Sequence, residues 1–446
     1  MSLFATLSQG DIWAMSGISF ASPISDILEK EDFTLEELLQ EEELLQEVKA
    51  HNVKLHKFLS SPDVVEKLVM YVMTPAEPDA DDLRLFKYPY MACEVFCCEV
   101  PDILQVLVHD NDGKLLNYLF TFLNNESPLD QHLAGYFEKI LEMLFRQMCV
   151  PVMKYLNDNN DSLIKNFLKH MNNYSIMQLV QRLMLPHIPF GIQNEDSPVD
   201  ENSQCTWSYS DVTCQMLCSR MLDGADANAD ADANVESTQV IDLDIHTPSH
   251  ISDLFMTVMQ LSPPEAPILT NISKENVIQK LLSSAMIDDG DTESASTLPT
   301  PKAAASLAAM TVLEAIISRL CETSHTMNHE NDELGVGTGS IDQDLHNNIK
   351  DSINRVCTCL MPFMEKIALQ LKNYATKQPC GLMSGQAKYA YPRLGHRGLQ
   401  LTKLVESIVR LDLPSLDDQL CSSGCIRSII DLIYEYDMNS MLHLSV

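Results

Sequence analysis

Apolar residues recur along most of this chain at steps of three and four positions, which is the spacing of one face of an α-helix. Thr34 and Glu37 have the spacing of a capping box and would begin the first helix, which the pattern predicts over 34–59. Its apolar stripe consists of Leu35, Leu38, Leu39, Leu45, Val48, Leu55, Phe58 and Leu59. The opposite face is acidic, and we interpret it as solvated, with a contact for a basic partner as the alternative. The acids are Glu36, Glu41, Glu42, Glu43 and Glu47.

Similar apolar runs follow as far as about residue 185, and proline or aspartate stands near the start of many of them. Short links between helices favour antiparallel neighbours. The chain shows no repeat by sequence identity, so no named repeat family can be assigned from spacing. The sequence therefore predicts an all-α fold, an irregular armadillo/HEAT-like α-solenoid. The expected runs are 62–73, 90–99, 101–109, 114–123, 128–145 and three more that end near 185.

The character of the chain changes over 186–302, where acidic residues far outnumber the bases, of which 186–301 contains three, Arg220, Lys274 and Lys280. Residues 223–236 read DGADANADADANVE, a low-complexity run that cannot form a packed core. We interpret the segment as an acidic, disordered insert that keeps a few short helices. We also expect that the part over about 196–301 is mostly disordered and that the chain folds without it. The apolar islands inside it are 212–222, 251–261 and 277–286.

Helical pattern returns after the insert, and the domain organisation follows. We expect a lead-in over 1–21, an N-terminal helical part over 22–185, the insert over 186–302 and a C-terminal helical part over 303–446. The last part stops soon after a helix without a solenoid cap, so we expect it to be incomplete. Its expected elements are helices at 303–321, 341–374, 399–411 and 424–434, with a glycine-containing loop at 378–398.

Charge and cysteine usage narrow the classes of function. The formal net charge of −33 would repel a phosphate backbone, which argues against nucleic acid as a partner. No stretch approaches about 18 consecutive apolar residues, so we expect no membrane insertion. The 13 cysteines are an odd number scattered through helical segments, which is typical of reduced, buried thiols. A protein of the cytoplasm or nucleus is expected.

A search for chemistry finds no catalytic group, no cofactor site and no metal site. Cys93 and Cys97 share a helix face and could supply half a zinc site at most, so we interpret them as core residues. His325 and His329 have the spacing of a helical metal pair but lack the adjacent glutamate of a zinc hydrolase. The glycines of 335–339 follow no apolar strand and indicate a linker. We expect a non-catalytic scaffold.

Several short segments of the sequence, which we call matching words, resemble one known family. Near the N-terminus these are SPI at 22–24, KED at 30–32, TLEELL at 34–39 and FKYP at 86–89 with ACE at 92–94. Near the C-terminus LGHR at 394–397 also matches. Together they resemble the SAPS family, the regulatory subunits of protein phosphatase 6 and its Sit4-like counterparts. The matching words lie in the two predicted helical parts, and none of them lies in the acidic centre.

The resemblance implies a helical-repeat subunit that binds a Ser/Thr protein phosphatase catalytic subunit of type 6 and directs its substrate choice. An ankyrin-repeat third subunit would join the complex. The alternative is a generic armadillo-like adaptor that binds basic peptides in transport or trafficking.

The candidate partner-binding residues are five. Lys87 and Tyr88 belong to one of the matching words, and Arg393, His396 and Arg397 form a basic cluster in an otherwise acidic chain. A guanidinium on a loop between rigid helices can grip a partner carboxylate in two places. The alternative is that these cations pair internally, for example with Glu406.

Overall fold

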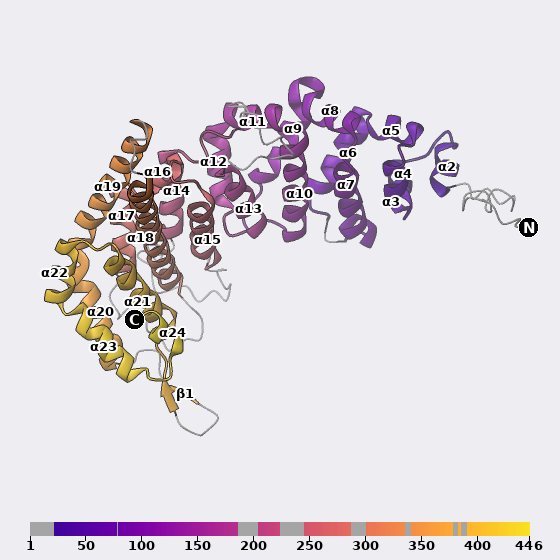
Figure 1. The fold of residues 1–446 in the computed structure, drawn as a ribbon. Helices are drawn as coiled ribbons and strands as arrows, with labels where there is room; N and C mark the ends of the chain where they lie inside the picture. The colour runs from indigo at the N-terminus through magenta and orange to yellow at the C-terminus, as the bar shows by residue number, and fades with distance from the viewer. Residues whose placement is uncertain are drawn as a thin grey trace, which may run out of the picture. The chain divides into compact units, whose positions relative to one another are not determined.

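The computed structural model of this chain describes residues 22–77, 79–185, 204–223, 245–286, 300–334, 340–377, 382–384 and 390–446. Helices account for nearly all of this described part, and the prediction of an all-α solenoid is confirmed (Figure 1). The chain forms two compact units, Met1–Val152 and Met153–Val446, which we call unit 1 and unit 2. The expected boundaries at 22, 186 and 303 stay predictions.

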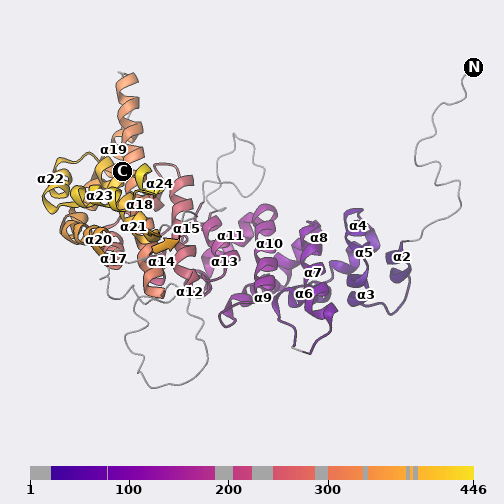
Figure 2. The same cartoon turned by 90° about the horizontal axis from the view of Figure 1, so that it is seen from below.

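Unit 1 is a series of short helices, each packed on its neighbours in sequence (Figures 1 and 2). The central helices α6, α7 and α10 contact one another and carry the core. Phe96, Phe122, Phe137 and Phe145 are fully buried there. The elements are α2 (Pro23–Leu28), α3 (Leu35–Gln40), α4 (Leu44–Lys49), α5 (Val53–Leu59), α6 (Pro62–Met73), the π-helical turn η1 (Leu83–Lys87), α7 (Tyr88–Cys97), α8 (Pro101–His109), η2 (Asp110–Gly113), α9 (Lys114–Phe120), η3 (Thr121–Asn124), α10 (Gln131–Gln147) and α11 (Cys149–Asp158), which crosses into unit 2.

Proline and side-chain caps place the helix starts where the sequence predicts them. Helices α6 and α8 begin at Pro62 and Pro101, because a proline at the first helical position lacks only an N–H that would have no helical partner. Thr34 caps α3 as expected, since its hydroxyl accepts a hydrogen bond of 3.3 Å from the Glu37 N–H. Local chemistry therefore fixes these ends without help from the rest of the fold.

The single helix predicted over 34–59 is wrong, because the structure has three short helices there. Glu41 turns extended after α3, and His51 takes a left-handed φ of 57° after α4. Asn52 then caps α5 by accepting a hydrogen bond from the Leu55 N–H at 3.3 Å. The break after α3 changes the helical phase, so Leu44 rather than the predicted Leu45 is buried.

Unit 2 is organised around α18 (Pro301–Leu334), which contacts α15, α17 and α21 (Figure 1). Within its span Pro301–His325, this helix is long and apolar enough to cross a membrane by length and composition alone. Its packing on three neighbours accounts for that composition. The other elements are α12 (Asn160–Lys169), α13 (Tyr174–Leu183), α14 (Asp211–Leu222), α15 (His246–Leu261), α16 (Pro267–Ile272), α17 (Glu275–Ala285), α19 (Ser340–Leu360), η7 (Met361–Phe363), α20 (Met364–Lys377), β1 (Leu382–Ser384), β2 (Ala390–Pro392), α21 (Gly395–Arg410), α22 (Pro414–Ser423), α23 (Cys425–Glu435) and α24 (Ser440–Leu444).

The apolar islands of the predicted insert are helices of the unit 2 core. They coincide with α14, α15 and α17, and α15 and α17 both pack on α18. Leu217, Phe255 and Leu281 are fully buried. This packing argues against the expectation that the chain folds without this segment, because removal would uncover the apolar face of α18. Residues 224–236 of the low-complexity run lie outside the described residues.

Three further differences concern the C-terminal half. The helix predicted over 341–374 is interrupted at η7, because Pro362 has no N–H to continue the helical hydrogen bonds. The predicted loop at 378–398 includes an antiparallel pair, β1 and β2, in which Met383 faces Tyr391. Helix α22 was not expected, although Pro414 at its start and Gly424 at its end, with a φ of 81°, are ordinary signals for both.

Candidate partner-binding surfaces

A group of exposed apolar side chains lies at the start of α7 in unit 1. Leu85, Phe86 and Tyr90 are 36%, 63% and 46% exposed, and we call these three residues the Phe86 surface. Leu85 and Phe86 belong to the π-helical turn η1, which leads directly into α7. A π turn changes the phase of side chains along a helix, and such turns are frequent at functional sites. The turn is thus the local reason why these apolar side chains face outward.

Polar contacts anchor this turn to α3 and to the end of α6. Lys87 donates from Nζ to the Gln40 carbonyl oxygen, and Gln40 Nε2 donates to the Tyr88 hydroxyl at 3.0 Å. Arg84 donates from Nη2 to the Thr74 carbonyl oxygen at 2.7 Å. The turn is therefore held from both sides, which limits the entropy that its apolar side chains would lose on binding a partner.

Two of the predicted site residues, Lys87 and Tyr88, have structural contacts here. Tyr88 is buried at 8% exposure, and its ring centroid lies 5.3 Å from that of Tyr71. Lys87 is half-buried and reaches the α3 backbone. The matching word FKYP thus presents Phe86 to solvent while the next two side chains fix the turn. The sequence analysis did not name Phe86 as a candidate. A signal was present, because the apolar pair at 85–86 does not continue the apolar face of α7.

A charged hydrogen bond supports the same region. The Tyr71 hydroxyl donates to Glu36 Oε1 at 2.6 Å, and the Arg84 guanidinium carbon lies 5.1 Å from the Tyr71 ring centroid. Burial and the hydrogen bond to Glu36 raise the pKa of Tyr71. Burial alone would raise the pKa of Glu36, but the hydrogen bond from Tyr71 and the nearby Lys67 charge lower it overall. Glu36 is therefore a structural carboxylate and not simply one of the solvated acids on its helix.

Of the cysteine pair of α7, Cys93 is a core residue as expected, whereas Cys97 is half-buried. Cys93 is fully buried and its Sγ donates to the Tyr136 carbonyl oxygen at 3.8 Å. A hydrogen bond with Cys97 and burial raise the pKa of Cys93. Among the described residues, no group of three or more His, Cys, Asp and Glu side chains could hold a metal ion. His329 and residues 335–339 of the other candidate motifs lie outside the described side chains.

The basic cluster at the start of α21 divides into internal and exposed members. Arg397 is half-buried and donates from Nη2 to the Ala285 carbonyl oxygen at 3.1 Å and to Gln370 Oε1 at 3.4 Å. Arg393 and His396 are exposed. Arg410 pairs with Glu406 at 2.6 Å, as the internal alternative expects. Arg397 thus joins α21 to the end of α17, while the partner role predicted for Arg393 and His396 stays a prediction.

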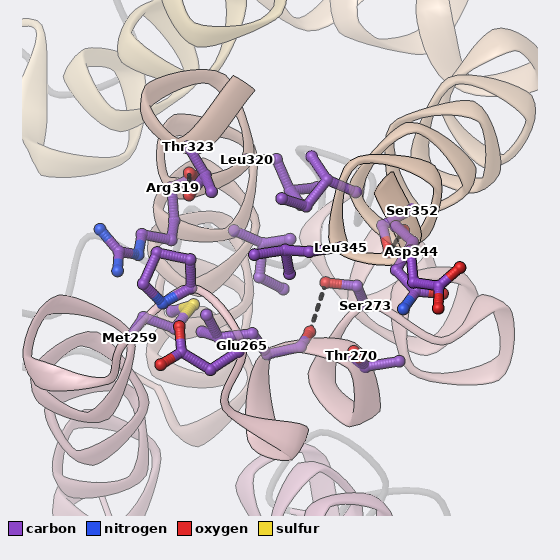
Figure 3. A pocket seen from close by; sticks show the side chains of 15 residues that line it. Met259, Glu265, Thr270, Ser273, Arg319, Leu320, Thr323, Asp344, Leu345 and Ser352 are labelled. Atoms are coloured by element: carbon purple, nitrogen blue, oxygen red, sulfur yellow. Dashed lines mark hydrogen bonds between the residues drawn. The ribbon is translucent and has the colours of Figure 1, made fainter. Parts of the chain in front are cut away.

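Unit 2 also contains a cavity of about 240 Å³ between α15, α16, α18 and α19 (Figure 3). Leu320 and Leu345 face its interior from α18 and α19, and Glu265 and Arg319 lie on the side opposite Asp344. Arg319 donates from Nη2 to the Ser262 carbonyl oxygen at 2.7 Å. None of the predicted site residues lines this cavity.

Three of the hydroxyl groups that line this cavity are used within the fold. Ser273, Thr323 and Ser352 each donate to the carbonyl oxygen of a residue one helical turn earlier, at 2.7, 2.7 and 2.9 Å. Such bonds turn a hydroxyl toward its own helix and away from a ligand. The cavity therefore offers mainly apolar surface, which can accept an apolar side chain.

Comparison with known proteins gives one consistent result. No family model matches the chain, and no solved structure matches it. Among curated proteins, serine/threonine-protein phosphatase 6 regulatory subunit 3 of Gallus gallus is 25% identical over 426 residues, which are 96% of this chain and 44% of the relative. Regulatory subunit 2 of Mus musculus is 26% identical over 432 residues, 96% of this chain and 42% of the relative. Regulatory subunit 1 of Mus musculus is 25% identical over 428 residues, 96% of this chain and 46% of the relative.

These matches extend the resemblance that short words first indicated. The chain spans less than half the length of these curated relatives. The span of the alignments includes the acidic centre, which the matching words did not reach. The resemblance is therefore confirmed: along 96% of its length this chain is a distant homologue of the SAPS-family regulatory subunits of protein phosphatase 6.

Proposed function

We propose that this chain is a non-catalytic regulatory subunit that binds a Ser/Thr protein phosphatase catalytic subunit of type 6 and directs its substrate choice. The observation that carries the proposal is the similarity over 96% of the chain to proteins named as regulatory subunits of that phosphatase. An α-solenoid suits this role, since it offers long faces for contacts with more than one protein.

The Phe86 surface is the contact that we propose for the catalytic subunit. Exposed aromatic side chains on a rigid support dominate many protein interfaces, because they bury a large apolar area at a small cost in side-chain entropy. Phe86 and Tyr90 meet both conditions, since η1 is fixed by Lys87 and Arg84. Arg393 and His396 remain candidates for a second contact, and an ankyrin-repeat protein is proposed as a third member of the complex.

Directing substrate choice would follow from orientation. A scaffold that holds the catalytic subunit at one surface and a substrate at another raises the effective concentration of that substrate at the active site. The phosphatase chemistry, with its metal ions, belongs in this proposal to the partner. The adaptor alternative predicts instead that the acidic faces of the solenoid retain basic cargo.

Affinity purification of the tagged chain from cell extract tests the proposal. We expect the type 6 catalytic subunit to be recovered with the wild-type chain. Phe86→Glu should reduce this recovery by at least about tenfold, since a central aromatic contact contributes about 2 kcal/mol or more. The matched control is Val53→Glu, because Val53 is an apolar residue of the same unit that is 79% exposed and lies outside the Phe86 surface.

The outcomes separate the function from the contact. Recovery of basic cargo without any type 6 catalytic subunit would contradict the regulatory function and favour the adaptor. Recovery that falls equally for Phe86→Glu and Val53→Glu would leave the function standing and refute the Phe86 surface. Phosphatase activity of the purified chain, free of any catalytic subunit, would contradict its non-catalytic role.

A further inference from the structure

The cavity between α15, α16, α18 and α19 in unit 2 has an apolar interior and a polar rim, and we call it the Leu320 cavity (Figure 3). Four buried apolar residues and two half-buried leucines line its interior: Met259, Ile316, Leu320, Ile349, Leu269 and Leu345. The lining residues that are exposed to solvent form the rim: Pro264, Glu265, Thr270, Asp344 and Asn348. Such an arrangement is typical of a site that removes one apolar group from water and orients it by polar contacts at the edge.

The volume of the Leu320 cavity suits one apolar side chain. The cavity measures about 240 Å³. An apolar cavity of about 150 Å³ is already large enough to accept benzene, so a leucine or phenylalanine side chain has room here. Sites that enclose a whole small-molecule ligand usually measure about 300–1,000 Å³. The cavity is therefore better matched to a single side chain of a larger partner than to an independent small molecule.

Acidic side chains stand on two sides of the cavity. Glu265 and Asp344 are exposed, and they lie on opposite sides of the apolar interior in Figure 3. Among the described residues, neither carboxylate forms an ion pair or a side-chain hydrogen bond. Two carboxylates that have no cation of their own favour a partner that brings lysine or arginine to both sides of the cavity.

The charge of Arg319 is accounted for within the fold. Arg319 is the single base among the lining residues. Its Nη2 donates to the Ser262 carbonyl oxygen at 2.7 Å, and its Nη1 lies 3.9 Å from Glu322 Oε2. Since Glu322 offsets the charge of Arg319, the two rim carboxylates leave the surroundings of the cavity negative.

We infer that the Leu320 cavity binds a peptide segment of a partner protein in which one leucine or phenylalanine is flanked on both sides by lysine or arginine. The apolar side chain packs on Leu320 and Leu345, and the flanking cations contact Glu265 and Asp344. A nucleic acid is excluded, because the acidic rim would repel its phosphates. This inference goes beyond the proposed function, since it concerns unit 2 and does not depend on which protein binds the Phe86 surface. Its failure would leave that function standing.

Fluorescence anisotropy with the full chain tests the inference. The probe is a short fluorescein-labelled peptide with a central phenylalanine and lysines on both sides. One control peptide has serine in place of phenylalanine, and another has glutamine in place of each lysine. The serine peptide keeps its charge, so it measures the attraction of any basic peptide to a chain of net charge −33.

A charge variant tests the rim. Glu265→Gln with Asp344→Asn removes the two rim charges and changes exposed side chains only. The matched control, Glu66→Gln with Asp431→Asn, removes two exposed charges of residues that do not line the cavity and gives the same net charge.

A second variant tests the apolar interior. Leu345→Gln makes one wall of the cavity polar at nearly constant size. The matched control is Leu369→Gln, because Leu369 is a residue of α20 that is 58% exposed and does not line the cavity. The rim variant decides the outcome if Leu345→Gln disturbs the packing of α19.

We expect the phenylalanine peptide to bind the wild type at least about tenfold more tightly than the serine peptide, because the aromatic ring leaves water. Each cavity variant should weaken binding of the phenylalanine peptide at least about fivefold relative to its control. Equal affinity for the phenylalanine and serine peptides would overturn the inference, because charge alone would then explain binding. Equal losses in the rim variant and its control, equal affinity for the glutamine peptide, or no binding to the wild type at low salt would also overturn it.

Discussion

The helices of the acidic centre offer the sharpest test of the fold. Phe255 lies in α15 and is fully buried against its neighbours, so Phe255→Ala removes a large side chain from the unit 2 core. Truncation of a buried phenylalanine to alanine costs about 3–5 kcal/mol, which combines the lost transfer free energy of the ring with the cavity that remains. The control is Leu261→Ala at the end of the same helix, where the side chain is 51% exposed and the cost should stay within about 0.5 kcal/mol.

Urea unfolding followed by circular dichroism measures both variants. With a slope of about 3 kcal/mol per molar urea, the loss for Phe255→Ala lowers the midpoint of the main transition by about 1–1.7 M. Leu261→Ala should leave the midpoint nearly unchanged. If the two variants unfold at the same urea concentration, α15 does not belong to the cooperative core, and the acidic centre would be dispensable for folding as the sequence first suggested.

Two further predictions concern single polar contacts. Arg397→Glu should lower the free energy of unfolding by about 1–3 kcal/mol, because it removes the donor to the Ala285 carbonyl oxygen, whereas Arg393→Glu, at an exposed side chain, should lower it by less. Equal thermal stability of the two variants would contradict a structural role for Arg397. Tyr71→Phe keeps the ring but removes the hydrogen bond to Glu36, and should cost about 1 kcal/mol at neutral pH. The folded state lowers the pKa of Glu36, so this contribution is present above the unfolded pKa of about 4.3 and is lost as pH falls further. Denaturation at pH 7 and pH 3 measures it, and a difference between wild type and variant that is the same at both values would refute the reasoning.

The sequence predicted the fold class because the signals for helices are local. Pro62 and Pro101 mark the starts of α6 and α8, and the Thr34 hydroxyl caps α3 from three residues away. The spacing of apolar residues then shows that helices must pack on helices. These features depend on neighbours within one or two turns, so they can be read without knowing the rest of the structure.

Predictions from local signals failed where the same pattern of apolar residues was compatible with two different structures. Over 34–59 the apolar residues of three separate helices imitate the spacing of one long helix. Each break changes the helical phase, yet leucines still stand close to the positions that one continuous helix would bury. The islands at 251–261 and 277–286 lie in an acidic, low-complexity context, yet Phe255 and Leu281 are core residues. Composition averaged over a segment hides the few apolar side chains that pack.

The candidate partner-binding residues also show what the sequence could predict and what only the fold decides. The sequence offered five equal candidates, which are Lys87, Tyr88, Arg393, His396 and Arg397. Residue type alone does not show whether a side chain contacts its own chain or a partner. The fold decides this, because only it brings Gln40 to Lys87 and the end of α17 to Arg397. It also turns Phe86 outward.

The sequence by itself determined that this chain is a series of helices, where many of them begin, and which family it resembles, because each of these depends on short stretches of residues. The tertiary structure decided which apolar faces are buried, that the acidic centre supplies part of the core, and that Arg397 reaches the end of α17. Those properties arise from contacts between residues far apart in the chain. They follow from how helices pack, which the pattern within any one helix does not specify.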